Sequence, residues 1–91
     1  MKSEQNNRKK IRERNREYVR KIKESGPCTD CNEYYHYSQM DFDHIDSKKH
    51  SIASLANSEA SIKTIKIEIG KCDLVCSNCH RFRTWMRTQG S

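Results

Sequence analysis

Two cysteine pairs constrain this chain more than any other feature. Cys28 and Cys31 form one C-x-x-C pair, and Cys76 and Cys79 form a second. Two such pairs supply the four thiolates that close a tetrahedral zinc site. Because a site with four cysteine ligands leaves no coordination position vacant, the sequence predicts a structural zinc ion that joins the two pairs.

The composition also favours a metal-stabilised domain. The chain has 91 residues, of which 33% are hydrophobic and 33% charged, so a single domain would have little apolar surface to bury. No stretch resembles a signal peptide or is long enough to span a bilayer, so we expect a cytoplasmic protein without a membrane partner. Paired thiols in such a compartment hold metal more often than they form disulfides. Cys72, the fifth cysteine, could replace one zinc ligand, but a small buried residue is the favoured interpretation.

Charge is distributed unevenly along the chain. Residues 1–24 hold ten Lys or Arg and four Glu, residues 25–46 hold five acidic residues and no Lys or Arg, and residues 80–91 hold three Arg and no acid. A basic segment, an acidic region and a basic tail would suit a polyanion contacted at both ends, with cations bound between them.

Hydrophobic periodicity predicts an α+β fold. The first helix should end at Gly26, which can supply a left-handed cap. The alternating isoleucines of residues 65–69 would fit a strand, but Ser58 can cap a helix and Gly70 can end one, so a helix is favoured there. The expected elements are helices over residues 5–24, 58–70 and 77–88 and strands over residues 39–45 and 73–75, with residues 46–57 irregular.

Asp43, His44 and His80 form a second candidate site. Adjacent side chains on a regular strand point to opposite faces, so the strand must end or bulge near Asp43 and His44 if both are to reach one site. A carboxylate and an imidazole with bound water would suit Mg²⁺, Mn²⁺ or a similar ion. The alternative is that Asp43 and His44 only form a hydrogen-bonded pair beside a cysteine turn.

The stretches CTDC, MDFDHID and KCDLVCSNCHR resemble the HNH endonucleases, and more specifically the small zinc-bearing HNH proteins of bacteria and their phages. The resemblance covers about residues 26–84. It implies a ββα-metal finger, also called a His-Me finger, in which a β-hairpin and one helix hold a divalent cation. We therefore expect a basic helical arm over residues 1–25 and an HNH domain over residues 26–91, in the cytoplasm of a bacterium or a phage-infected host.

This resemblance implies residue roles in a metal-dependent DNA endonuclease or nickase that leaves 5′-phosphate and 3′-hydroxyl ends. Asp43 and His80 would bind the catalytic cation, Mg²⁺ or Mn²⁺, and His44 would be the general base. Many family members carry an asparagine that braces the base-bearing loop, but residues 70–73 contain none. The brace is therefore unassigned, with Lys71, Cys72 and Asp73 as candidates. The four paired cysteines would hold the structural zinc.

Basic side chains at both ends of the chain are the expected contacts to DNA phosphates, which position a duplex without reading its sequence. One finger has one site, so we expect nicking of double-stranded DNA with weak sequence preference; a homodimer would be needed for concerted double-strand cleavage, and a partner protein could supply targeting. The alternatives are a non-catalytic zinc module that binds nucleic acid and a zinc domain for protein interaction. The candidate phosphate contacts are Arg12, Arg16, Arg20, Arg81, Arg83 and Arg87.

Overall fold

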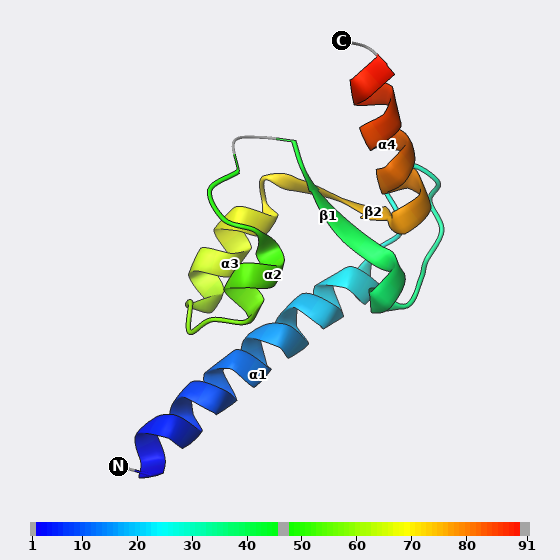
Figure 1. Cartoon of the computed structure of the whole chain (residues 1–91). Coiled ribbons are helices and arrows are strands. Elements are labelled where there is room, and N and C mark those ends of the chain that lie inside the picture. Colours follow the sequence, from blue (N-terminus) through cyan, green and yellow to red (C-terminus); the bar gives the residue numbers. More distant parts are fainter. Residues whose placement is uncertain (1, 46–47, 90–91) are drawn as a thin grey trace.

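The computed structural model describes residues 2–45 and 48–89, and within them the chain folds into four α-helices, one 3₁₀ turn and a two-stranded antiparallel sheet. The expected α+β class is confirmed. Figure 1 shows α1 running diagonally below the other elements, with the sheet and α4 above its C-terminal end. The elements are α1 (Lys2–Ser25), η1 (Tyr37–Gln39), β1 (Met40–His44), α2 (Ile52–Ala56), α3 (Ile62–Ile69), β2 (Cys72–Cys76) and α4 (Ser77–Gln89).

Helix α1 forms as expected, and its N-terminal part extends away from the rest of the molecule (Figure 1). It ends at Ser25, whose hydroxyl donates to the Ile22 carbonyl at 2.8 Å. Pro27 cannot continue a helix because it lacks an N–H group. The expected left-handed cap at Gly26 is wrong, since no glycine in the described part of the chain has positive φ.

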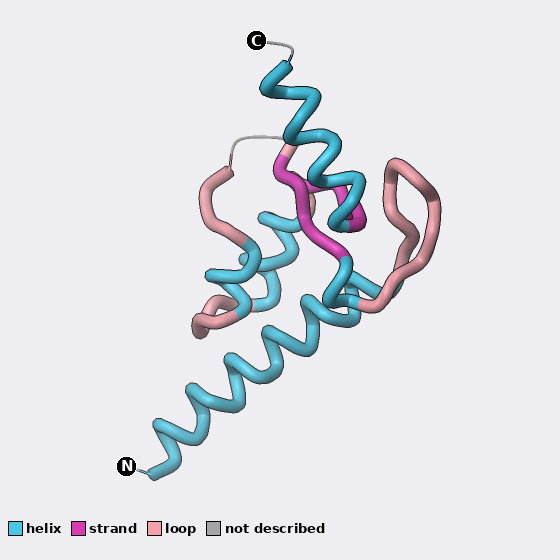
Figure 2. The backbone as a smooth tube through the Cα atoms, turned by 45° about the vertical axis from the view of Figure 1, so that its right-hand side comes forward, coloured by secondary structure: helices cyan, strands magenta, loops and turns pink. Residues whose placement is uncertain are grey.

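The larger apolar core lies between α1, α2 and α3, which pack together in both views (Figures 1 and 2). Its buried members are Val19, Ile52, Leu55, Ala56 and Ile65. Helix α2 lies where the sequence predicted irregular structure. Burying one apolar turn against α1 stabilises a helix this short, which would be marginal by itself.

Helix α3 confirms a helix within residues 58–70, but its start was wrongly placed. The helix begins at Ile62, and its N-cap is Ser61, whose hydroxyl accepts from the Thr64 N–H at 3.1 Å. Ser58 instead lies in the α2–α3 turn, where its hydroxyl donates to the Leu55 carbonyl at 2.8 Å.

Asn15 is a fully buried amide in the middle of α1, and it ties the α2–α3 turn to that helix. Its Nδ2 donates to the carbonyls of Ser58 and Ala60 at 3.0 and 2.9 Å. Its Oδ1 accepts from the Arg14 guanidinium, so the oxygen and the amide nitrogen of this side chain both have hydrogen-bond partners. One polar side chain therefore fixes where the turn lies against α1.

Asn15→Ala should destabilise the zinc-loaded protein by about 1–3 kcal/mol, because the Ser58 carbonyl loses its side-chain donor and the Ala60 carbonyl keeps only the longer bond from Arg14, at 3.3 Å. Urea unfolding followed by circular dichroism measures the change. Arg16→Ala is the control, because Arg16 only contacts the exposed Asn57 side chain, at 3.4 Å, and its loss should cost less than about 0.5 kcal/mol. Equal effects of the two substitutions would show that Asn15 does not hold the turn.

Strands β1 and β2 pair over their whole length, from Met40 opposite Cys76 to His44 opposite Cys72. Both expected strands are therefore present, within two residues of their predicted bounds. Helix α4 begins directly after β2, without a connecting loop. A second buried cluster forms where this sheet meets the cysteine turns; it consists of Cys28, Met40, Val75 and Cys76.

Among the described residues, no helix has both the length and the apolar character that crossing a bilayer requires.

Candidate functional site

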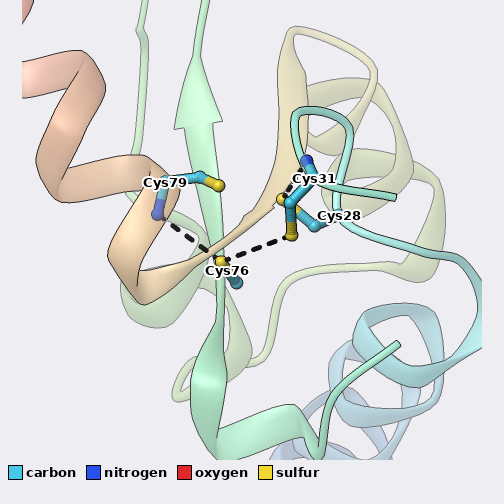
Figure 3. Close-up of side chains that lie close together, drawn as sticks. All are labelled: Cys28, Cys31, Cys76 and Cys79. Atoms are coloured by element: carbon cyan, nitrogen blue, oxygen red, sulfur yellow. Dashed lines mark hydrogen bonds between the residues drawn. The ribbon is translucent and has the colours of Figure 1, made fainter. Parts of the chain in front are cut away.

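The four paired cysteines converge on one point (Figure 3). Their Sγ atoms all lie within 4.8 Å of one another, and Cys31 Sγ is 4.0 Å from Cys76 Sγ. A tetrahedral zinc ion with Zn–S bonds of about 2.3 Å needs sulfurs about 3.8 Å apart. This sulfur cluster, Cys28, Cys31, Cys76 and Cys79, could therefore hold a metal ion, as expected for structural zinc.

Short-range backbone geometry positions the first cysteine pair. Asn32 has a φ of 64°, a left-handed conformation that asparagine tolerates better than most residues. This lets the Asn32 N–H donate to the Cys28 carbonyl at 2.8 Å and close the turn. Thr29 then docks the turn on β2, because its N–H and its hydroxyl both donate to the Leu74 carbonyl at 2.8 Å.

The second pair is positioned by regular structure. Cys76 is the last residue of β2, and Cys79 lies in the first turn of α4. The Cys79 N–H points to Cys76 Sγ at 3.5 Å, and the Cys31 N–H points to Cys28 Sγ at the same distance (Figure 3). Such N–H groups stabilise thiolates, and thiolates are the form that binds zinc.

Ionisation of the sulfur cluster is uneven. Burial opposes ionisation of Cys28, but backbone N–H groups outweigh it and lower the pKa of this thiol to about 6. Burial, followed by the neighbouring sulfurs, raises the pKa of Cys79 to about 12. A bound dication would remove this conflict, because it compensates several negative sulfurs at once. Cys72 lies outside the cluster, where its thiol donates to the Glu68 carbonyl at 3.5 Å.

His80 lies between two carboxylates of β1. Its Nδ1 is 3.0 Å from Asp41 Oδ2, and its Nε2 is 3.6 Å from Asp43 Oδ1. Two ligands in adjacent positions of an octahedral Mg²⁺ ion are about 3 Å apart. The Asp43 oxygens already accept from Arg83 and Arg87, so Asp43 and His80 could share a cation only if one of these guanidiniums gave way. Asp41 would orient the His80 imidazole through Nδ1, as carboxylates commonly do for metal-binding histidines.

Asp43 is also the centre of an ion-pair network. It is 4% exposed, and it accepts hydrogen bonds from Arg83 Nη1 at 2.8 Å and from Arg87 Nη2 at 2.6 Å. The bonds from Arg87 outweigh burial and, with those from Arg83, lower the pKa of Asp43 to about 2. Arg83 further bridges Asp30 at 2.6 Å and Asp73 at 3.0 Å. One guanidinium thus joins the first cysteine turn to both strands.

His44 ends β1, which meets the condition that the strand must end where Asp43 and His44 occur. The two side chains nevertheless diverge: Asp43 meets α4, whereas His44 Nε2 contacts Glu68 Oε2 on α3 at 2.9 Å. His44, His80 and Asp41 line one open cavity of about 330 Å³. Asp43 does not line it, but lies 3.6 Å from the His80 ring that does. Both imidazoles, His44 and His80, thus line one cavity, and the Asp43 carboxylate lies outside its lining.

Sequence reasoning missed the carboxylates that contact these imidazoles. Asp41 could have been found, because it lies two residues before Asp43 and shares its strand face. Glu68 gave no local signal, since it meets His44 only through the packing of α3. Neither Lys71, Cys72 nor Asp73 contacts His44 in this way; Lys71 Nζ instead binds Glu68 Oε1, at 3.3 Å.

The six arginines singled out for DNA contact have different surroundings. Arg12 pairs with Glu59 at 3.1 Å, and Arg20 lies over the Tyr37 ring at 5.2 Å. Arg81 is exposed on α4. Arg83, with a side chain only 19% exposed, is mainly engaged inside the protein.

Comparison with family models, curated proteins and solved structures found no match for this chain.

Proposed function

We propose that the chain is a metal-dependent HNH-type endonuclease that nicks double-stranded DNA. The observation that carries the proposal is the arrangement of His44 and His80 along one cavity, with Asp43 Oδ1 3.6 Å from His80 Nε2. A base and a pair of cation ligands are the groups that metal-assisted phosphodiester hydrolysis requires. The sulfur cluster would bind a structural zinc ion, which would hold β2 and α4 in place.

The charge around the cavity suits a phosphate. Lys23 and Lys48 line it together with the two imidazoles, and the one carboxylate in its lining, Asp41, is paired with His80. Helix α1 adds further basic side chains along its exposed face, which would contact the backbone of a duplex beside the cavity. These contacts do not read base edges, so we expect weak sequence preference.

In this proposal His44 removes the proton from a water molecule. The water oxygen forms a bond to phosphorus and the bond from phosphorus to the 3′ oxygen breaks. The departing oxygen takes a proton from solvent, His44 returns its proton to solvent, and the products carry 5′-phosphate and 3′-hydroxyl ends. A neutral imidazole suits this task near neutral pH. Asp43 and His80 would hold a divalent cation, which relieves charge on the phosphate and on the departing oxygen.

The second candidate function is a zinc-stabilised module that binds nucleic acid without cleaving it. The hydrogen bonds of Asp43 favour this function, because Arg83 and Arg87 already donate to its two carboxylate oxygens. A cation would have to displace or share these partners. Arg87 is the guanidinium able to withdraw, because its side chain is 52% exposed, whereas that of Arg83 is 19% exposed.

A plasmid assay separates the two functions. Zinc-loaded protein is incubated with supercoiled plasmid in Mg²⁺ or Mn²⁺, and EDTA is then added at a concentration at which circular dichroism shows the fold intact. We expect nicked circles that accumulate with metal, stop with EDTA and resume when Mg²⁺ or Mn²⁺ is restored. Retarded migration of the plasmid without nicking, across the whole metal series, would support the binding module and refute the endonuclease.

A further inference from the structure

We infer that Glu68 is the positioning residue of the His44 imidazole, which it holds so that Nδ1 faces the reaction and Nε2 carries the hydrogen. This inference deepens the proposed function and rests on it for the catalytic role of His44. The geometric basis is the 2.9 Å contact between His44 Nε2 and Glu68 Oε2. The His44 side chain is 12% exposed and that of Glu68 is 4% exposed, so water competes little for this bond.

The Glu68 carboxylate is itself held rigidly. Its Oε2 also accepts the backbone N–H groups of Lys49 and His50, at 3.1 and 3.4 Å. Its Oε1 accepts from Lys71 Nζ at 3.3 Å. Burial raises the pKa of Glu68, but these donors together with His44 outweigh it and lower the pKa to about 2. Apart from His44, this buried carboxylate receives two backbone N–H groups and a lysine, and is therefore an ionised acceptor.

The protonation of the ring follows from this. An ionised carboxylate can only accept a hydrogen bond, so His44 Nε2 must donate one. In a neutral imidazole the other nitrogen then bears the lone pair. Nδ1 is therefore the atom that can take a proton from water, and Glu68 stabilises the positive ring that results.

Glu68 also holds in place Lys49 and His50, which lead into α2. It lies in the last turn of α3, which is anchored by the fully buried Ile65. Its bonds to Lys49 and His50 tie down the chain that enters α2, next to the cavity-lining residues Lys48 and Ser51. The brace that was unassigned from sequence is thus contributed by a helix rather than by the residues just before the second cysteine pair.

A purely structural role for Glu68 would make different predictions, so the test measures the ring directly. In protein with ¹⁵N-labelled histidine, at a pH where the ring is neutral, long-range ¹H–¹⁵N spectra identify the His44 tautomer; its signals are assigned by their loss in His44→Ala. We expect hydrogen on Nε2 in the parent protein and a mixture of tautomers in Glu68→Ala. A parent His44 with hydrogen on Nδ1 would overturn the inference, and this measurement needs no cleavage activity.

Kinetics with matched variants completes the test. Glu68→Ala should lower the single-turnover nicking rate by about 10- to 100-fold, as loss of a histidine-orienting partner does elsewhere, while DNA affinity changes less than twofold. Glu68→Gln keeps an oxygen acceptor but loses the negative charge, so its rate should lie between those of Glu68→Ala and the parent. Ile67→Ala truncates an exposed side chain next to Glu68 on α3, outside the contacts to the carboxylate, and should nick at the parent rate.

Each outcome has a distinct meaning. Glu68→Ala that nicks as fast as Ile67→Ala would overturn the positioning role. If Glu68→Ala does not fold, the inference is tested by the His44 tautomer in the parent protein and by the nicking rate of Glu68→Gln. If the parent protein never nicks, the endonuclease proposal is refuted. Hydrogen on His44 Nε2 in that protein, and its loss from this position in Glu68→Ala, would still support the contact between His44 and Glu68.

Discussion

Replacing Cys76 with serine should unfold the sheet and α4 and abolish zinc binding. Cys76 is buried, and its sulfur belongs both to the sulfur cluster and to the small apolar cluster with Met40 and Val75. Structural zinc contributes about 10–16 kcal/mol of apparent binding free energy in small domains. That equals or exceeds the total stability of about 5–15 kcal/mol of a typical native protein. The variant should therefore lack a cooperative urea transition for this half of the molecule.

Zinc released per chain and dispersion of amide signals in NMR spectra measure the effect. Excess chelator added to the parent protein should reproduce it. Cys72→Ser is the matched control, because Cys72 is a cysteine of β2 outside the sulfur cluster. It should retain one zinc ion per chain and a urea midpoint close to that of the parent. If Cys76→Ser behaved like Cys72→Ser in both respects, the sulfur cluster would not be a structural metal site.

Replacing His44 with alanine should slow metal-dependent nicking by about 10²–10⁴-fold, the usual contribution of a general base. The fold should survive, because Glu68 keeps Lys71 and the Lys49 N–H as partners for its carboxylate. Zinc content and DNA retardation should also be unchanged, since His44 belongs neither to the sulfur cluster nor to α1. The measurement is the initial rate of nicked-circle formation at equal protein, metal and salt.

His50→Ala provides the matched control for this prediction. His50 is exposed and lies close to His44 along the chain, and its backbone N–H bond to Glu68 does not depend on the side chain. His50→Ala should nick at the parent rate. Equal rates for His44→Ala and His50→Ala under the same metal conditions would remove His44 from the reaction and leave nucleic-acid binding as the function to pursue.

The features that could be predicted from sequence are those encoded over a few residues. The C-x-x-C spacing determines a local turn, so the sulfur cluster was predictable from two short stretches. Alternation of Met40 and Phe42 with Asp41 and Asp43 likewise predicted β1 to within a residue or two. Helix α2 was missed because its five residues are too few to establish a period, although Ile52, Leu55 and Ala56 have helical spacing. Its stability comes from packing Ile52 and Leu55 against Val19.

The candidate site was only partly predictable for the same reason. His44 and His80 have recognisable neighbours in sequence, and the structure places both along one cavity. Their carboxylate partners are determined by tertiary packing: Glu68 reaches His44 from α3, and Asp41 reaches His80 across the sheet. Asn15 is the extreme case, a polar residue in a basic helix whose burial depends entirely on the α2–α3 turn.

Arg83 has a consequence for how this molecule would respond to oxidants. Its guanidinium bridges Asp30, between the first two cysteines, to Asp43. Cys31 in the same turn is exposed, and exposed thiols are the ones that oxidants reach first. Oxidation of Cys31 would release the turn from the metal, and Arg83 would transmit that displacement to Asp43. Chemical damage at the sulfurs would thereby reach Asp43, the carboxylate proposed as a cation ligand, while the core around Val19 remained folded.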